Sequence, residues 1–531
     1  MVIQISFLVL FFALMVTVGF YYRKKAASVE GFVLGSRGAG PWLTAFAFGT
    51  SYFSAVIFVG YAGQFGWNFG ISSTWIGLGN AFIGSLLPWV ILGRRTRIMT
   101  NHLGSKTMPE FFEARYDSKT LKLISAIIVF VFLIPYTASL YNGLSRLFSM
   151  AFPSVDYTVC IIIMSVLTCV YVLLGGYMAT AMNDFIQGIF MLGGIVAVIT
   201  AVLRINGGFS GSIQKLAETS GWQYTSFFGP DALFLFFVVT LTSLGTWGLP
   251  QMVGKFYAIK DEDSIKKGTI ISSVFAVIVA GGCYFLGGFS RLFANADINT
   301  GKPVINGEIV SYDRLVPSML ENLGPIIIGI VLVLVLSASM STLSSLVLTS
   351  GSTVTLDLIA PLRKKGISEK GKMILMRLLV VFFVILSAII AIYQVNAQSG
   401  SSVTFIANLM GVSWGALAGA FIGPFLWGLY FKKTSRAAVY VSFITGVSMS
   451  LLQLFKSLNG LTFNIEFLDN IVFKTSIHSG AFAMILSLVI VPIISMFTKK
   501  QSDDRIEEIF SCYKKTVTVK ATDVLKLDEE K

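Results

Sequence analysis

Long apolar stretches recur along the chain, and they constrain its fold more than any other feature. About 20 consecutive apolar residues are enough to cross a bilayer as a helix. Of the 531 residues, 55% are hydrophobic and only 13% are charged, whereas roughly a quarter of the residues in an ordinary soluble domain are charged. This composition excludes a disordered chain, a disulfide-stapled secreted module and a soluble enzyme. The sequence therefore predicts an all-α polytopic membrane protein.

Thirteen stretches are long enough to be transmembrane helices. The first follows no basic segment, so we expect a membrane helix there rather than a cleaved signal peptide. The thirteen predicted spans are Ile3–Tyr22, Trp42–Phe65, Ile71–Leu92, Leu121–Phe148, Val155–Leu174, Thr180–Leu203, Ala232–Phe256, Gly268–Phe293, Ile326–Leu358, Lys372–Val395, Val403–Phe431, Ala437–Leu454 and Ser479–Phe497.

The positions of the basic residues predict the orientation of the spans. With the N-terminus outside, most of the 40 Lys and Arg residues fall in alternate loops, in the segments 23–37, 94–122, 255–267, 363–372 and 432–436 and in the tail after Phe497. Lys255 is among these expected loop residues. Cytoplasmic loops carry an excess of Lys and Arg, so we expect a multi-pass protein of the plasma membrane with a cytoplasmic C-terminus. Topology explains the net charge of +13, and we expect no nucleic-acid partner and no obligate protein partner.

Sequence signatures of direct ATP use and of metal-dependent hydrolysis are absent. No glycine-rich loop ends in Lys-Ser or Lys-Thr, and no HExxH motif is present. The two histidines, His102 and His478, lie on opposite sides of the membrane in the predicted topology. We therefore expect a protein that is not an enzyme.

Two predicted spans carry interruptions that are typical of broken transporter helices. The second contains Gly49 followed by Thr50 and Ser51, and the seventh contains Gly248 followed by Leu249-Pro250. These interruptions lie about one five-helix unit apart, and an odd number of crossings inverts the second copy. We expect an N-terminal helix in 1–40, inverted repeats in 41–207 and 231–431, two further helices in 432–497 and a solvated tail in 498–531.

The ninth span has an unusual density of hydroxyl residues. With 3.6 residues per turn, Ala338, Ser341 and Thr342 share one stripe. The carbonyl of Ala338 and the two hydroxyls, facing the carbonyls of Thr50 and Phe53, would form a cage of neutral oxygens suited to a monovalent cation. A divalent ion would normally require carboxylates. The alternative is small-residue helix packing, and the spacing alone does not separate the two.

These features resemble the sodium:solute symporter family, whose members share the LeuT-type five-plus-five inverted repeat. The resemblance covers the chain up to Phe497. It rests on the order and spacing of several short motifs, namely Gly35-Ser36-Arg37, Thr107-Met108-Pro109-Glu110-Phe111, Gly175-Gly176-Tyr177, Asn183-Asp184-Phe185-Ile186-Gln187, Trp247-Gly248-Leu249-Pro250-Gln251 and Met340-Ser341-Thr342.

The resemblance implies sodium as the coupling ion, with one site made by Thr50, Phe53, Ala338, Ser341 and Thr342. Some family members hold a second sodium, which would here fall on Asp184, Ser344 and Ser345. An intramembrane carboxylate is costly and is therefore a functional candidate, although Asp184 as a structural carboxylate near the cytoplasmic interface is the alternative.

Departures from the family pattern bear on the substrate. Sugar carriers have Gln and Glu where this chain has Ile57 and Thr74, and proline carriers have an acid where it has Tyr52, which argues against both substrates. We expect a small carboxylate-bearing metabolite, such as an organic acid, an amino acid or an acidic sugar. The cavity residues expected to bind it are Ser54, Thr74, Tyr136, Ser139, Thr246 and Trp247. Sodium-coupled sugar or polyol transport is the alternative, ahead of a channel or a membrane sensor.

Overall fold

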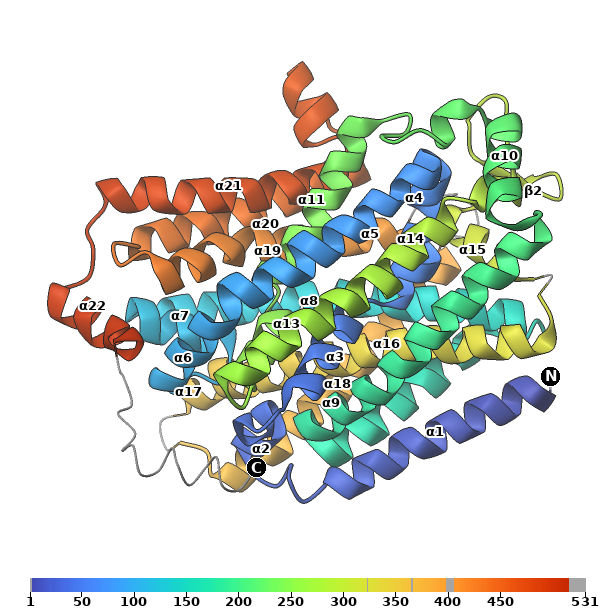
Figure 1. Ribbon diagram of the computed structural model, residues 1–531. Helices are drawn as coiled ribbons and strands as arrows, with labels where there is room; N and C mark the ends of the chain where they lie inside the picture. Colours follow the sequence, from blue (N-terminus) through green and yellow to red (C-terminus); the bar gives the residue numbers. More distant parts are fainter. Residues whose placement is uncertain (1, 322, 364–365, 398–404, 515–531) are drawn as a thin grey trace, which may run out of the picture.

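The computed structural model describes residues 2–321, 323–363, 366–397 and 405–514, and the fold is almost entirely helical. The long helices are α1 (Val2–Tyr22), α8 (Lys119–Ala151), α9 (Tyr157–Ile205), α11 (Ala232–Gly248), α13 (Glu262–Ala276), α16 (Pro325–Thr353), α18 (Glu369–Ala397), α19 (Phe405–Tyr430), α20 (Arg436–Asn459) and α21 (Ser476–Phe497). These helices run between two opposite ends of the molecule (Figure 1).

Shorter elements connect or interrupt the long helices. The short α-helices are α2 (Val29–Leu34), α3 (Pro41–Tyr52), α4 (Ala62–Phe69), α5 (Thr74–Ala81), α6 (Arg94–His102), α7 (Met108–Tyr116), α10 (Gly208–Ser220), α12 (Pro250–Tyr257), α14 (Gly282–Gly287), α15 (Leu315–Leu320), α17 (Ala360–Leu362) and α22 (Asp503–Phe510). The 3-10 and π segments are η1 (Gly35–Arg37), η2 (Val56–Tyr61), η3 (Gly70–Ser73), η4 (Phe82–Leu86), η5 (Trp89–Gly93), η6 (Trp222–Tyr224), η7 (Val277–Gly281), η8 (Ser290–Leu292), η9 (Tyr312–Arg314), η10 (Val354–Ile359), η11 (Leu468–Val472) and η12 (Ser511–Tyr513).

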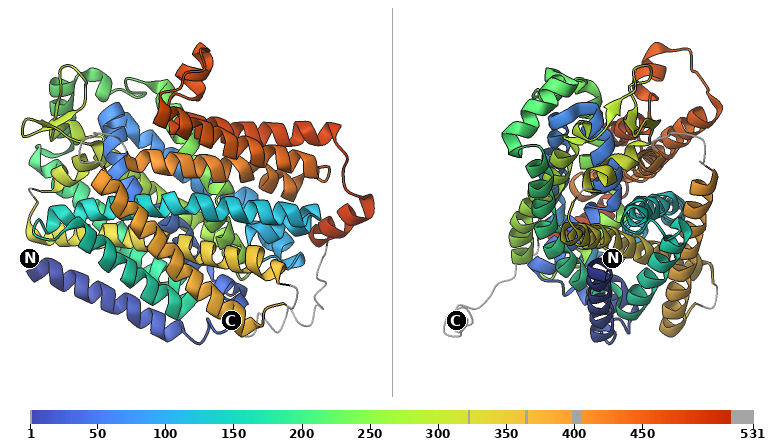
Figure 2. Two further views of the ribbon diagram at one scale, coloured as in Figure 1. Left: turned by 180° about the vertical axis from the view of Figure 1, so that it is seen from behind. Right: turned by 90° about the vertical axis from the view of Figure 1, so that its right-hand side faces the viewer.

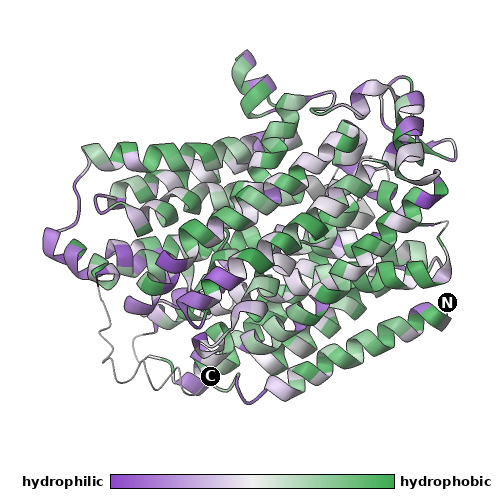
Figure 3. Ribbon diagram, viewed as in Figure 1, coloured by the Kyte–Doolittle hydropathy of each residue, from purple (hydrophilic) through white to green (hydrophobic). Residues whose placement is uncertain are grey.

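One end of the molecule carries α6, α17 and α22, and we call it the α22 end (Figure 1). The opposite end carries α10, α15 and a small antiparallel sheet of β1 (Asn295–Ala296), β2 (Pro303–Ile305) and β3 (Glu308–Ile309), in the order β1-β2-β3. We call it the β2 end; the view from behind shows the same separation (Figure 2, left). Apolar residues dominate the flanks between the ends, while hydrophilic residues gather at the ends (Figure 3), as expected for a bundle surrounded by lipid.

Ten helices in the described part of the chain are long and apolar enough to cross a membrane, or eleven if the bent pair of α11 and α12 is one span. The predicted spans differ from this set for local reasons. The second is divided because α3 stops after 12 residues, and its remainder joins the third in one run, Val56–His102. The fifth and sixth are joined in α9, where Gly176 with φ 54° marks the kink between them.

Residues 498–514, the described part of the segment after Phe497, differ from the solvated tail that we expected. Its helix α22 buries Ile506, Ile509 and Phe510, and α22 packs against α6 at the α22 end. Arg115 of α7 donates a hydrogen bond to Gln501 at 3.1 Å. The few apolar residues of α22 stand in an otherwise polar segment of the sequence, and they anchor this part of the chain to the helix bundle.

Candidate functional site

The break in the second predicted span exposes backbone oxygens in the middle of the protein. Helix α3 ends at Tyr52, and Phe53 is extended with φ −89° and ψ 121°. The Phe53 N–H donates to the carbonyl of Gly49 at 3.1 Å, and the next helical segment begins directly after Ser54, whose carbonyl accepts from Ile57. The last carbonyls of a helix have no partner within it, so those of α3 are available to other groups.

Helix α16 supplies hydroxyls to these carbonyls. Ser341 donates to the carbonyl of Thr50 at 2.9 Å and lies 3.1 Å from the carbonyl of Ala338. The Thr342 hydroxyl lies 3.2 Å from the carbonyl of Ser51 and 3.1 Å from that of Ala338. These five residues of α3 and α16, Ser51 included, are buried. Four of the five predicted sodium ligands, Thr50, Ala338, Ser341 and Thr342, are thus brought together.

Phe53, the fifth predicted ligand, lies beside this group, but the hydrogen bonds described above do not involve it. Its side chain is buried, and its extended backbone forms the break. In the described part of the chain, the hydrogen bonds that join the other four residues do not include its carbonyl. The Ser51 carbonyl, which we did not predict, accepts from Thr342 instead.

The predicted second cation site holds a side chain that we had placed in a loop. Lys255 of α12 is 3% exposed, because it follows the bend between α11 and α12 into the bundle. Its ammonium lies 2.9 Å from the Ser345 hydroxyl and 3.5 Å from the Asp184 carboxylate. Ser344 points elsewhere, donating to the carbonyl of Ser341 at 2.9 Å. The loop assignment of Lys255, made from the charge pattern, was wrong: the residue lies at the end of the seventh predicted span, where α12 continues beyond the bend.

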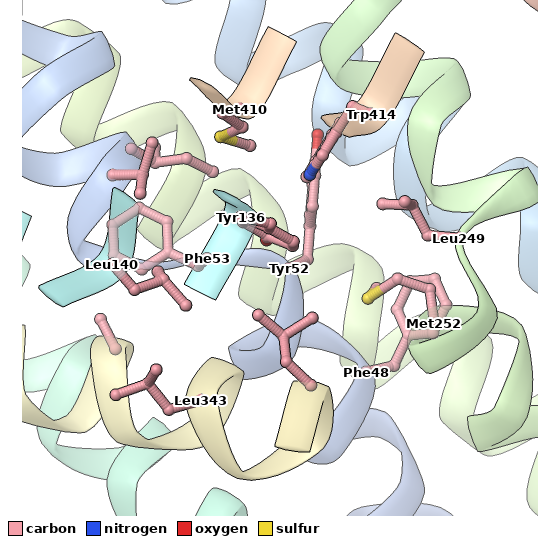
Figure 4. Packing of buried hydrophobic residues seen from close by; sticks show 14 of the residues in the cluster. Phe48, Tyr52, Phe53, Tyr136, Leu140, Leu249, Met252, Leu343, Met410 and Trp414 are labelled. Atoms are coloured by element: carbon pink, nitrogen blue, oxygen red, sulfur yellow. The ribbon is translucent and has the colours of Figure 1, made fainter. Parts of the chain in front are cut away.

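Three aromatic residues from different helices meet beside the break. Trp414 of α19 stacks on Tyr52 with ring centroids 6.2 Å apart and meets Tyr136 of α8 edge to face at 5.9 Å. Figure 4 shows these three rings close together, with Phe53 nearby. The Tyr52 hydroxyl donates to the carbonyl of Thr242 at 2.8 Å. The aromatic group therefore connects both broken helices.

The predicted substrate residues fall into two groups. Ser54 and Tyr136 lie at the break, and the buried Ser54 hydroxyl has no hydrogen-bond partner among the described residues. Ser139 donates to the carbonyl of Tyr136 at 2.7 Å. Of these three residues, Ser54 alone has a buried hydroxyl without a partner among the described residues.

Like Ser139, the other three predicted substrate residues donate hydrogen bonds to backbone carbonyls. Thr74 donates to the carbonyl of Ile71 at 2.7 Å. Thr246 donates to the carbonyl of Gly84 at 2.8 Å. The Trp247 indole donates to the carbonyl of Ile83 at 2.8 Å. The last two contacts fix α11 against η4.

The sequence did not identify two residues that lie close to the helix breaks, Trp414 and Asn80. Trp414 is one of many aromatics in an apolar span, and nothing in its neighbourhood distinguishes it. Asn80 accepts hydrogen bonds from Thr242 at 2.8 Å and Ser243 at 3.1 Å. An amide inside an apolar span is the signal that could have identified Asn80, since polar side chains at membrane depth require partners.

A cavity at the α22 end reaches the group around Lys255. Its wall is mixed in polarity and includes hydroxyls of α16 one and two turns beyond the predicted sodium ligands. The lining residues are Val33, Leu34, Lys106, Thr107, Met108, Tyr177, Thr180, Pro250, Gln251, Gly254, Lys255, Tyr257, Ser345, Leu348, Thr349, Ser352 and Thr353. The cavity thus connects the α22 end with the Lys255 and Ser345 side chains.

Comparisons with known proteins place this geometry in a family. The osmoregulated proline transporter OpuE of Bacillus subtilis is 27% identical over 494 residues, covering 92% of this chain and 94% of the relative. A sodium/proline symporter of Staphylococcus aureus is 28% identical, covering 82% of this chain and 83% of the relative.

Solved structures show the same fold. The substrate-bound outward-open state of a Na+-coupled sialic acid symporter superposes with a TM-score of 0.71 at 18% sequence identity, covering 94% of this chain and 98% of that one. The model of the sodium:solute symporter family matches residues 32–446. This chain therefore belongs to the sodium:solute symporter family.

Proposed function

We propose that this sodium-coupled transporter imports a small carboxylate-bearing metabolite: an organic acid, an amino acid or an acidic sugar. The observation that carries the proposal is the buried hydroxyl of Ser54, which has no hydrogen-bond partner among the described residues and directly precedes the helical segment after the break. The first N–H groups of a helix lack intrahelical partners and favour an anion. A carboxylate at this position would accept hydrogen bonds from these N–H groups and from Ser54.

The sodium ion would bind at the cage on the other side of the break, with the carbonyls of Thr50, Phe53 and Ala338 and the hydroxyls of Ser341 and Thr342 as ligands. The short distances among four of these groups support this assignment. The break thus presents carbonyls to a cation and N–H groups to an anion. Occupation of one side would favour occupation of the other, which is the coupling that a symporter needs.

Transport would proceed by alternating access, as in other carriers with discontinuous helices. Sodium and solute would bind from outside, the broken helices would rock against the rest of the bundle, and both would leave at the α22 end. A membrane potential that is negative inside contributes about 2.3 kcal/mol for each 100 mV to the inward movement of one positive charge. The cavity that reaches Lys255 from the α22 end supports this side as the exit.

The similar proteins support a carboxylate without identifying it. Two relatives are named for proline and one solved structure for sialic acid, and both of these compounds carry a carboxylate. Tyr52 stands where proline carriers have an acid, so the present chain differs from them at the break. Ile57 and Thr74 replace the polar pair of sugar carriers, which disfavours the alternative of a neutral sugar or polyol.

The proposed topology has thirteen spans, with inverted repeats in 41–207 and 231–431, in the plasma membrane, the N-terminus outside and the α22 end in the cytoplasm. The two breaks support the repeat. Phe53 and Leu249 have nearly the same backbone angles, and each donates to the carbonyl four residues earlier, that of Gly49 or Gly245, at 3.1 Å. Gly245, rather than Gly248 as the sequence indicated, is the counterpart of Gly49.

Thermal stabilisation of the purified protein in sodium and in potassium buffers tests the substrate class, since a ligand that binds only the folded state raises stability. The panel should pair each carboxylic acid with its amide or methyl ester, and should include neutral hexoses and polyols. We expect a sodium-dependent shift with at least one acid and none with its neutral pair. The Ser54→Ala variant should lose this shift, whereas Ser165→Ala, whose hydroxyl binds its own helix at 2.8 Å, should keep it. Stabilisation by neutral sugars alone would overturn the proposal.

A further inference from the structure

Lys255 carries a positive charge into the place where a second sodium ion would bind. Its side chain is 4% exposed, and that of Asp184, its ion-pair partner, is fully buried. Charged groups inside a membrane protein are rare and pair with one another because isolation is costly. Asp184 comes from α9 and Lys255 from α12, so the pair joins a helix of the first repeat to the broken helix of the second.

The surroundings of the ammonium are those expected of a monovalent cation site. Its nearest partner is the Ser345 hydroxyl at 2.9 Å, followed by the Asp184 carboxylate at 3.5 Å. The ring of Tyr177 lies 5.5 Å away on a further side, within the range of a cation–π contact. A carboxylate, a hydroxyl and an aromatic face thus converge on one nitrogen.

Hydrogen-bond directions connect this group to the sodium cage. An ammonium only donates, so Ser345 accepts from Lys255, and its own hydrogen is free to bind the Ser51 hydroxyl at 2.9 Å. The carbonyl of Ser51 accepts in turn from Thr342. Ser345 also follows Ser341 by about one turn of α16. The ammonium and the cage are therefore neighbouring cation positions along one helix.

We infer that the Lys255 ammonium is the built-in cation of the Asp184–Ser345 position, so that this transporter binds one sodium ion rather than two. A sodium ion bound to Asp184 and Ser345 would lie in van der Waals contact with the ammonium, and like charges at such a distance repel strongly in a buried site. The inference rests on the proposed sodium site at Thr50, Ser341 and Thr342. It leaves the identity of the transported solute open.

Direct counting of bound ²²Na⁺ on the purified, monodisperse full chain tests the inference without any solute. We expect one sodium per chain in the wild type and still one in Asp184→Asn, because in our assignment Asp184 binds Lys255 and not sodium. Lys255→Met vacates the position beside an intact carboxylate, and we expect two sodium ions per chain. Lys255→Arg keeps the charge and should bind one. The double variant Asp184→Asn/Lys255→Met lacks both charges and should return to one.

The outcomes separate this inference from the proposed function. Two sodium ions in the wild type, falling to one in Asp184→Asn, would show that Asp184 ligates sodium and would overturn the inference. A count of one in a well-folded Lys255→Met variant would also overturn it. If Lys255→Met does not fold, the wild-type and Asp184→Asn counts still decide. Retention of one sodium by Ser341→Ala/Thr342→Ala with Lys255 intact would instead refute the proposed cage, and failure of the solute screen would leave all these counts unchanged.

Discussion

Ser341 of α16 donates a hydrogen bond to the backbone carbonyl of Thr50 in α3 at 2.9 Å, across 291 positions of sequence. The contact exists because α3 ends two residues after Thr50 and leaves that carbonyl without a partner in its own helix. A single hydroxyl thereby ties the first broken helix to α16, a span that is largely buried within the bundle. Any cation that replaces this hydrogen bond alters how α3 and α16 are held together.

Replacement of both hydroxyls should remove sodium binding. In Ser341→Ala/Thr342→Ala, two of the five proposed ligands are lost, and hydrogen bonds or ligand contacts to charged groups are each worth about 1.5–3 kcal/mol. We expect the sodium affinity, measured as sodium-dependent thermal stabilisation, to fall about 100-fold or more.

Ser339→Ala is the matched control for this experiment. Ser339 is equally buried on α16, but its hydroxyl donates to the carbonyl of Val335 in the same helix at 2.8 Å. Its removal should leave the sodium response unchanged. A double variant that responds to sodium as the wild type does would contradict the assigned site.

Local patterns made the contact between α3 and α16 predictable. Gly49 followed by hydroxyl residues indicates a break, and the spacing of Ala338, Ser341 and Thr342 indicates one helix face. Both the helical period and the helix break depend on residues that are close together in the chain, so a single sequence is enough to recognise them. The two features were therefore expected to face each other, the family resemblance implied the same pairing, and hydrogen bonds join α3 and α16.

The features that the sequence did not predict depend on how the helices are oriented relative to one another, which the pattern of consecutive residues does not encode. Lys255 follows an apolar run and precedes Lys260, so charge patterning places it in a loop, whereas the 45° bend between α11 and α12 turns it into the bundle. Trp414 meets Tyr52 only because the tertiary fold brings these two distant residues together. The helix α22 has just three buried apolar residues, too few to stand out in a polar tail.

The kink of α9 should depend on glycine at position 176. Gly176 has φ 54° and ψ −152°, a region open essentially only to glycine. A Cβ there would also lie 2.9–3.0 Å from atoms of Phe32. We expect Gly176→Ala to cost about 1–3 kcal/mol, seen as a lower melting temperature in detergent. Gly193→Ala, on the same helix, adds a Cβ with no atom within 4 Å and should not lower it. Equal melting temperatures for the two variants would contradict the strain argument.

The buried carboxylate of Asp313 in η9, in the connection at the β2 end, should make stability depend on pH. Burial raises the pKa of Asp313 to about 6, and the nearby Arg146 opposes this only in part. The folded protein therefore holds the proton more tightly than the unfolded chain, and the free energy of unfolding falls as pH rises from about 4 to about 6. The full effect is about 3 kcal/mol.

Replacement of Asp313 by Asn tests this dependence. We expect Asp313→Asn to raise the melting temperature at pH 7.5 and to change it little at pH 4.5, where the native carboxyl is protonated. Glu308→Gln, which alters an exposed carboxylate in the same connection, should show no such difference. A larger loss of stability at pH 7.5 than at pH 4.5 in Asp313→Asn would show that the ionised form is the stabilised one.

The buried guanidinium of Arg115 fastens the α22 segment to the bundle. Its Nε donates to the carbonyl of Gly428 at 2.8 Å and its Nη2 to that of Phe431 at 3.2 Å. Its Nη1 donates to Gln501 at 3.1 Å, and the ring of Phe510 lies 5.0 Å from the guanidinium carbon. The end of α19, the segment before α22 and α22 itself thus meet at one planar group.

Lysine cannot reproduce this arrangement, because its ammonium is a single point on a flexible stem and lacks the planar fork of donors. We expect Arg115→Lys to lower the free energy of unfolding by about 2–3 kcal/mol and to loosen α22, so that trypsin cleaves after Arg505 earlier than in the wild type. Lys514→Arg changes an exposed residue that pairs with Glu507 at 3.1 Å and should shift stability by less than about 1 kcal/mol, with no change in that cleavage rate. If Arg115→Lys melts like the wild type and keeps α22 equally protected, the guanidinium is not what holds this segment in place.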